Sequence, residues 1–150
     1  MCKKNTSTAV RFIALLLIFS LIVPVYANAA VVETVQPRAS AYLDNYGAYV
    51  YLPGNGQVQV YFNVTGTGYM DELGALSISI YESTDGVNWT WKDTFMHDLT
   101  PGMLSYNDDF HTGHVTYNGV VGRYYKAYVC IWGGKNGQGD TRYFWTSAKH

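Results

Sequence analysis

Residues that could bind a metal ion are concentrated in one segment, Asp108 to His114, which holds two aspartates and two histidines. Imidazole and carboxylate groups bind zinc, and aspartate oxygens bind calcium. Structural zinc sites usually also contain cysteine, however, and the segment lacks the spacing of an EF-hand. His111 and His114 are three residues apart, so on a strand they point to opposite faces. We expect a solvated segment and no cofactor here; a metal site is the alternative.

Catalytic arrangements are scarce in this chain. It has no Gly-x-Ser-x-Gly elbow, no His-Glu-x-x-His pair and no phosphate-binding loop. The nearest candidates for a catalytic carboxylate pair, Glu72 or Glu82 with Asp85, fall at predicted turns and strand ends, where acids are usually solvated. Cys130 has no base or orienting group near it in the sequence, so we expect a buried small hydrophobe; a reactive thiol is the alternative. The pattern predicts no enzyme activity.

Aromatic residues are the most informative feature, with 14 Tyr and 4 Trp in 150 residues. Many of them alternate with aliphatic residues, which places them on the outer faces of strands. Sugar rings stack on such surfaces, and protein interfaces also use Tyr and Trp. The alternative is a purely structural role, because tyrosine is common in strands and packs against its neighbours across a sheet. The candidate ligand-binding residues, for an unidentified protein or glycan partner, are Tyr61, Tyr81, Tyr124, Tyr128 and Trp132.

The N-terminus predicts export. Basic residues precede an apolar run from Phe12 to Val25, and the small residues Ala27-Asn28-Ala29 follow. This order is typical of a secretory signal peptide, residues 1–29. A membrane anchor is the alternative, but the run is shorter than the roughly 20 apolar residues that a spanning helix needs. We therefore expect a secreted protein with no membrane span after cleavage.

The remaining chain has the size of one domain, with a flexible N-terminal lead (residues 30–39) before a β domain (residues 40–150). Three of the ten basic residues lie in the predicted signal peptide, whereas all eleven acidic residues follow it. The mature chain is therefore acidic, which makes nucleic-acid binding unexpected. With Cys2 removed, Cys130 has no partner for an internal disulfide.

Alternation with a period of two, bounded by Gly, Pro, Asn and Asp, predicts about seven strands and no helix after residue 29. The clearest is 57–65, and in 73–81 Leu76 is expected to face inward with Ile78 and Ile80. In 89–95, Trp89 and Trp91 are expected to share the inner face with Phe95. The other expected strands lie within 40–52 and at 111–117, 123–132 and 141–147. Flat apolar faces need covering, so we expect an antiparallel β-sandwich.

Two segments resemble known motifs. Gly122 to Val129 resembles the penultimate strand of immunoglobulin-like and fibronectin type III-like domains, in which an aromatic residue near the strand start caps a corner. Tyr125 matches that position best, and Tyr124 is the alternative; the cysteine pair of antibody domains is absent. Ser83 to Trp89 resembles the Asp-box turn of sialidase-like propellers but occurs only once, and we interpret it as a structural turn.

The chain after the signal peptide also resembles a family of small exported proteins of Gram-positive-type bacteria whose function is unknown. The segments that carry this resemblance are Pro37 to Tyr42, Met70 to Ser77, Thr100 to Leu104 and Gly122 to Tyr128. The resemblance implies export from a bacterial cell and brings no chemistry with it.

Overall fold

The structure, a computed structural model, describes residues 40–150; the predicted signal peptide (1–29) and N-terminal lead (30–39) lie outside the described residues. All its regular elements are strands: β1 (Leu43–Gly54), β2 (Gln57–Ser83), β3 (Thr90–Met96), β4 (Leu104–Asn118), β5 (Tyr124–Lys135) and β6 (Gln138–Trp145). They form one antiparallel sheet. In residues 40–150 no helix exists that could cross a membrane.

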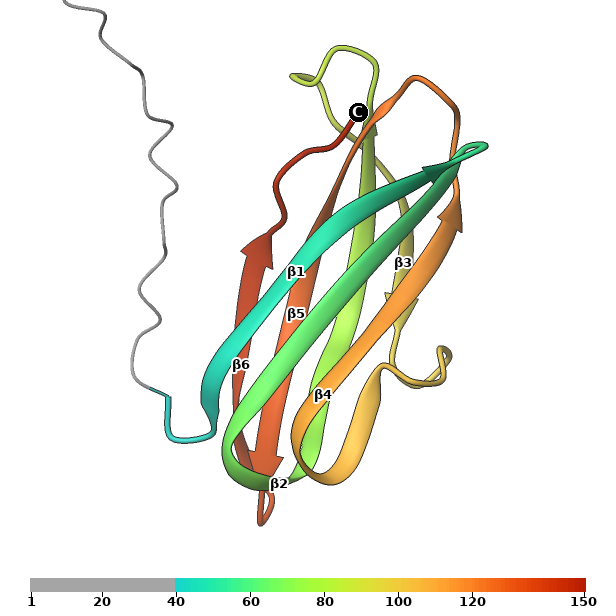
Figure 1. Cartoon of the computed structure of the whole chain (residues 1–150). Coiled ribbons are helices and arrows are strands. Elements are labelled where there is room, and N and C mark those ends of the chain that lie inside the picture. The colour runs from blue at the N-terminus through green and yellow to red at the C-terminus, as the bar shows by residue number, and fades with distance from the viewer. Residues whose placement is uncertain (1–39) are drawn as a thin grey trace, which may run out of the picture. The chain divides into compact units, whose positions relative to one another are not determined.

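The long strand β2 organises this sheet. Its first part pairs with β1 on one side and with β4 on the other, and its last part pairs with β3 and β5. The ladder between β2 and β4 is interrupted between Thr65 and Met70, where β2 turns back on itself (Figure 1). As a result β2 runs through both layers of the curled sheet. One layer holds β1, the first part of β2 and most of β4, and the other holds β3, the last part of β2, β5 and β6.

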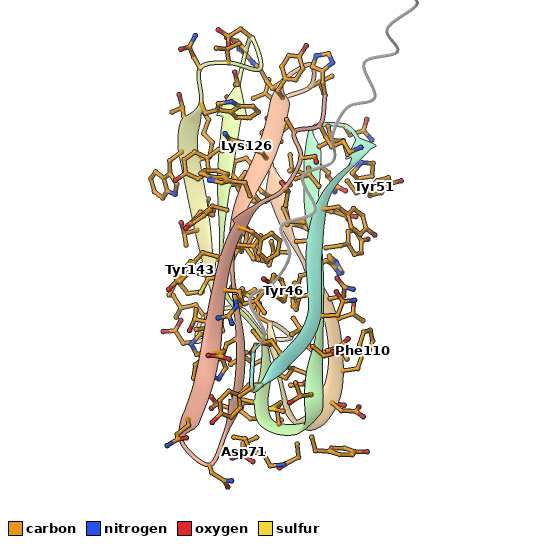
Figure 2. The ribbon with its side chains drawn as sticks, turned by 90° about the vertical axis from the view of Figure 1, so that its left-hand side faces the viewer. Tyr46, Tyr51, Asp71, Phe110, Lys126 and Tyr143 are labelled. Carbon is orange, nitrogen blue, oxygen red and sulfur yellow. The ribbon has the colours of Figure 1, made fainter. Side chains whose placement is uncertain are left out.

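The hydrophobic core lies between these layers. Val58, Val60, Phe62 and Val64 alternate along the first part of β2 and are buried, as their spacing predicts. From the facing layer, β5 contributes the fully buried set Tyr125, Ala127, Val129 and Ile131. In Figure 2, Tyr46 lies between the layers, Tyr51 and Phe110 lie on one outer side, and Lys126 and Tyr143 lie on the other.

The strand count differs from the prediction of about seven. The predicted strands 57–65 and 73–81 are parts of a single strand, β2, because residues 66–72 continue it instead of forming a loop. The strand expected at 111–117 begins earlier, because β4 starts at Leu104. The described residues therefore form six antiparallel strands. The all-β class is confirmed.

Register shifts overturn two predictions of side-chain direction. A shift between Ala75 and Ser77 leaves Leu76 half-buried, while Leu73 and Ala75 are fully buried instead. A second shift, between Ile80 and Tyr81, leaves one extra residue in β3. Phe95 pairs with Ile78 and packs on the core, but Trp91 pairs with Tyr81 and is 56% exposed. One inserted residue reverses which face a side chain occupies.

The β5–β6 connection is shorter than expected. The expected strands 123–132 and 141–147 leave residues 133–140 between them, but β5 and β6 both extend into this stretch and leave a turn at Asn136-Gly137. Both residues have positive φ, 54° and 73°. This is the conformation of a two-residue type I′ hairpin, for which Asn-Gly is a preferred sequence.

Candidate binding surfaces

The five predicted ligand-binding residues do not form one cluster. Tyr81 and Tyr128 meet on the outer face of the β2–β5–β6 layer, where both contact Trp145. Tyr61 lies in the other layer, within 6.4 Å of Tyr51 between ring centroids. Tyr124 stacks on His150 at 4.2 Å. Trp132 lies toward the far end of β5 and hydrogen-bonds to Glu72. The structure thus divides the predicted face between two opposite surfaces.

The first surface is an aromatic ladder across β1, β2 and β4. Tyr49 and His114 are direct cross-strand partners of Tyr61. Their rings stack on it at centroid distances of 5.2 Å and 5.0 Å. Both faces of the Tyr61 ring are therefore occupied by neighbouring rings, and its hydroxyl donates to Gln59 at 3.0 Å. This arrangement stabilises the strand pairing and leaves no Tyr61 face for a ligand.

The second surface, which we call the Trp145 cluster, consists of Tyr81, Tyr128, Tyr143 and Trp145. Tyr81 and Tyr128 each lie 4.8 Å from Trp145, and Tyr128 stacks on Tyr143 at 6.0 Å. Tyr143 is 61% exposed and Trp145 is 48% exposed. The cluster therefore combines a rigid, mutually packed base with aromatic area that solvent can reach.

A lysine is built into the edge of this cluster. The ammonium of Lys126 lies 4.4 Å from the ring of Trp89 and 4.3 Å from the ring of Trp145. A cation held between two indoles gains electrostatic attraction from both ring faces. Lys126 fixes Trp145 in place and puts a positive charge beside the aromatic surface.

Sequence reasoning missed Tyr143 and Trp145, although a signal for them existed. The two residues flank Phe144, which packs on the core, so their alternation with it placed them on the outer face of β6. Lys126 and Trp89 gave no such signal, because they come together only through the pairing of β2 with β5 and the turn that leads into β3.

Tyr125 caps a corner at the start of β5, as the resemblance to immunoglobulin-like domains implied. Its hydroxyl accepts a hydrogen bond from the Val120 amide at 2.6 Å and donates to Glu82 Oε2 at 2.7 Å. Burial raises the pKa of Tyr125 to about 12, with the Glu82 carboxylate adding to the effect. Burial opposes ionisation of Glu82, but hydrogen bonds from Tyr125 and Lys92 outweigh it and lower the Glu82 pKa.

The Ser83–Trp89 segment forms the structural turn that its sequence indicated. Asp85 Oδ1 accepts hydrogen bonds from the amides of Val87 at 2.9 Å and Asn88 at 2.8 Å, and Gly86 has a φ of 73°. These backbone donors, together with the Asn88 side chain, lower the Asp85 pKa well below its usual range. All of this carboxylate's contacts are local, so its role is to hold the turn.

The predicted metal-ligand residues are spread over both faces of β4. His114 stacks on Tyr61 on the outer face, whereas His111 contacts Phe62 of the core and its Nε2 lies 2.9 Å from the Gly102 carbonyl oxygen. The predicted opposition of the two histidines is therefore confirmed. Within residues 40–150, no three His, Cys, Asp or Glu side chains come together as a metal site.

Cys130 is buried, and burial raises its pKa, so the thiol form is favoured. Its side chain is covered by Tyr143, whose pKa is raised by its contact with the thiol. The expectation of a buried hydrophobic cysteine is confirmed.

Comparison with known proteins adds no relationship: no protein-family model matches the chain, and no curated protein matches it.

Proposed function

We propose that this chain is a secreted, non-enzymatic binding domain that contacts a partner on a cell surface through the Trp145 cluster. Secretion rests on the order of basic, apolar and small residues in positions 1–29. We further propose that the curled sheet is an immunoglobulin-like sandwich. Two observations support this assignment: the facing layers, and the Tyr125 hydroxyl bonded to the backbone five residues upstream near the start of the penultimate strand.

The observation that carries the binding proposal is the exposure of Tyr143 and Trp145 on a preorganised base. Rigid aromatic side chains lose little conformational entropy on binding and bury a large area each. Tyr and Trp also dominate the residues that contribute most to protein interfaces. The side chains of the Trp145 cluster already pack on one another in the free protein. Binding a partner therefore costs less side-chain conformational entropy than it would for mobile side chains.

The test is co-sedimentation of the purified protein with intact Gram-positive bacterial cells. The informative variant is Tyr143→Ser combined with Trp145→Ser, both at exposed positions. The matched control is Tyr49→Ser with Tyr51→Ser, which removes rings of similar exposure from the opposite layer. We expect the first variant to weaken binding by at least about tenfold and the control to bind like the unmodified protein. No binding to cells, or an equal loss in both variants, would contradict the proposal.

Pretreatment of the cells identifies the partner class. Protease digestion of the cell surface abolishes binding to a protein partner, whereas periodate oxidation abolishes binding to a glycan. We expect the protease-sensitive result for the Trp145 cluster, because the Lys126 charge beside aromatic rings suits an interface with a protein.

The alternative function is that of a carbohydrate-binding module. It is favoured by one specific observation, the pocket that the indole of Trp132 lines. Periodate sensitivity in the cell assay, with unchanged binding after protease digestion, would favour this alternative.

A further inference from the structure

A pocket of ≈ 380 Å³ lies at one end of the sheet, between the bend of β2 and the β5–β6 turn. The side chains that matter for its chemistry are Trp132 and Tyr106, the carboxylates Asp71 and Glu72, and the polar residues Lys135 and Gln138. Figure 2 shows Asp71 at this end, away from Lys126. The pocket is thus a site distinct from the Trp145 cluster.

The indole of Trp132 is held in a fixed position. Its Nε1 donates to Glu72 Oε2 at 3.2 Å, and its ring lies against the backbone of Gly134 and Gly139. A Cβ on either glycine would collide with the six-membered ring of the indole. Two glycines therefore provide the space in which the indole lies, and the ring forms a preorganised wall of the pocket.

Hydrogen-bonding capacity surrounds this ring. Asp71 Oδ2 accepts from the Asn136 amide at 2.6 Å, which fixes the carboxylate beside the turn. Gln138 accepts from the Tyr42 hydroxyl at 3.2 Å. Within residues 40–150, Asp71 Oδ1, Glu72 Oε1 and the Gln138 amide nitrogen make no further hydrogen bond. These groups remain available to a ligand.

An aromatic wall next to free acceptors and a donor suits a ligand that is apolar on its faces and hydroxylated around its rim. A pyranose ring has this character: its C–H faces stack on an indole, and its hydroxyls donate to carboxylates. A purely apolar ligand would desolvate the two carboxylates without giving them donors, which is costly. The pocket is lined by two carboxylates and only one lysine. This excess of negative charge disfavours binding of an acidic sugar.

We propose that this pocket binds one pyranose unit of an uncharged oligosaccharide, stacked on Trp132 and hydrogen-bonded by Asp71, Glu72 and Gln138. This inference deepens the alternative function proposed above and rests on the chain being a binding domain. Tyr106, which is 64% exposed, stands on β4 and provides a second aromatic contact.

The experiment is isothermal titration calorimetry of the full chain with cellotetraose, chitotetraose and mannotetraose, and with tetragalacturonate as the acidic counterpart. We expect at least one neutral tetrasaccharide to bind and tetragalacturonate to bind more weakly. Trp132→Ala should weaken binding by at least about tenfold. Trp91→Ala removes an equally large, 56% exposed ring from β3 and should leave binding unchanged.

Trp132→Phe is a second variant for the case in which Trp132→Ala fails to fold. It keeps an aromatic ring in the pocket and deletes the hydrogen bond from the indole to Glu72. We expect it to bind more weakly than the unmodified protein and more tightly than Trp132→Ala. Binding of none of the neutral sugars, or equal binding by Trp132→Ala and the unmodified protein, overturns the inference. Either result leaves the cell-surface assay unaffected, since that assay depends on Tyr143 and Trp145. If the protein binds a sugar through Trp132 but does not bind to cells, the cell-surface proposal is rejected and the pyranose site at Trp132 is supported.

Discussion

The hydroxyl of Tyr125 lies 2.7 Å from Oε2 of Glu82 and ties the start of β5 to the end of β2. The same hydroxyl accepts a hydrogen bond from the Val120 amide. The ammonium of Lys92, on β3, lies 3.0 Å from the other carboxylate oxygen of Glu82, Oε1. One buried phenol therefore joins the β4–β5 connection, β2 and, through Glu82, β3. Because Tyr125 and the Glu82 side chain are largely removed from solvent, these two groups depend on one another for hydrogen bonds.

Tyr125→Phe should lower the free energy of unfolding by about 1–3 kcal/mol. The ring still fills the core, but the Val120 amide and the Glu82 carboxylate each lose a hydrogen-bond partner. Urea unfolding followed by circular dichroism measures the change. Tyr143→Phe, which deletes the hydroxyl of a 61% exposed tyrosine, is the matched control and should change stability far less. Equal effects would show that the Tyr125 hydroxyl is not structurally important.

Alkaline pH should destabilise the protein through the same tyrosine. The folded pKa of Tyr125, about 12, lies above the unfolded value of about 10, so the folded state holds the proton more tightly. Its contribution is complete below about pH 10 and is lost as pH rises toward 12, by up to about 2–3 kcal/mol. Urea midpoints measured across this range should fall more steeply for the unmodified protein than for Tyr125→Phe. Parallel curves would contradict the assigned shift.

Acid should act on Glu82 with the opposite sign. Its pKa is lowered in the folded state, so its contribution is present above the unfolded value of about 4.3 and is lost as pH falls through the folded value. Glu82→Gln removes this contribution while preserving an acceptor for Tyr125. The difference in stability between the two proteins should shrink between about pH 6 and pH 3. A difference that stays constant over this range would rule out the proposed role of the carboxylate.

Gly134→Ala should displace the Trp132 indole. A Cβ at Gly134 meets the ring, whereas one at Gly68 meets no atom within 4 Å, and neither glycine has a positive φ. Gly68→Ala is therefore a control that adds the same methyl group without a collision. We expect Gly134→Ala to lower stability by about 1–3 kcal/mol and to weaken sugar binding, and Gly68→Ala to do neither. Thermal melts and the calorimetric titration measure the two effects.

Cys130 should react with a thiol reagent only when the protein opens. Its side chain is buried and its pKa is raised, so little thiolate is present or accessible at neutral pH. Because the full chain also contains Cys2, the experiment uses Cys2→Ser. The rate of modification by an aromatic disulfide should be slow in buffer and rise steeply in urea. Fast modification in buffer would show that the thiol is exposed.

Local pattern alone specified much of this protein. Alternation of Val58, Val60, Phe62 and Val64 indicated a half-buried strand, and Asn-Gly or Asp-Gly pairs marked four connections between strands, because these signals depend only on neighbouring residues. The corner at Tyr125 and the turn at Asp85 were also recognisable for this reason. The all-β class followed from the same patterns.

Tertiary structure decided the rest. The bend of β2 joined two predicted strands, and register shifts at Ser77 and Tyr81 moved Leu76 and Trp91 away from the core, because one inserted residue reverses every later side chain. The division of the aromatic residues depends on pairing between distant strands: Tyr61 meets Tyr49 and His114, whereas Tyr128 meets Trp145. Alternation along one strand determines whether a side chain faces the core or the solvent. Only the order of the strands in the sheet determines which of the solvent-facing residues share a surface.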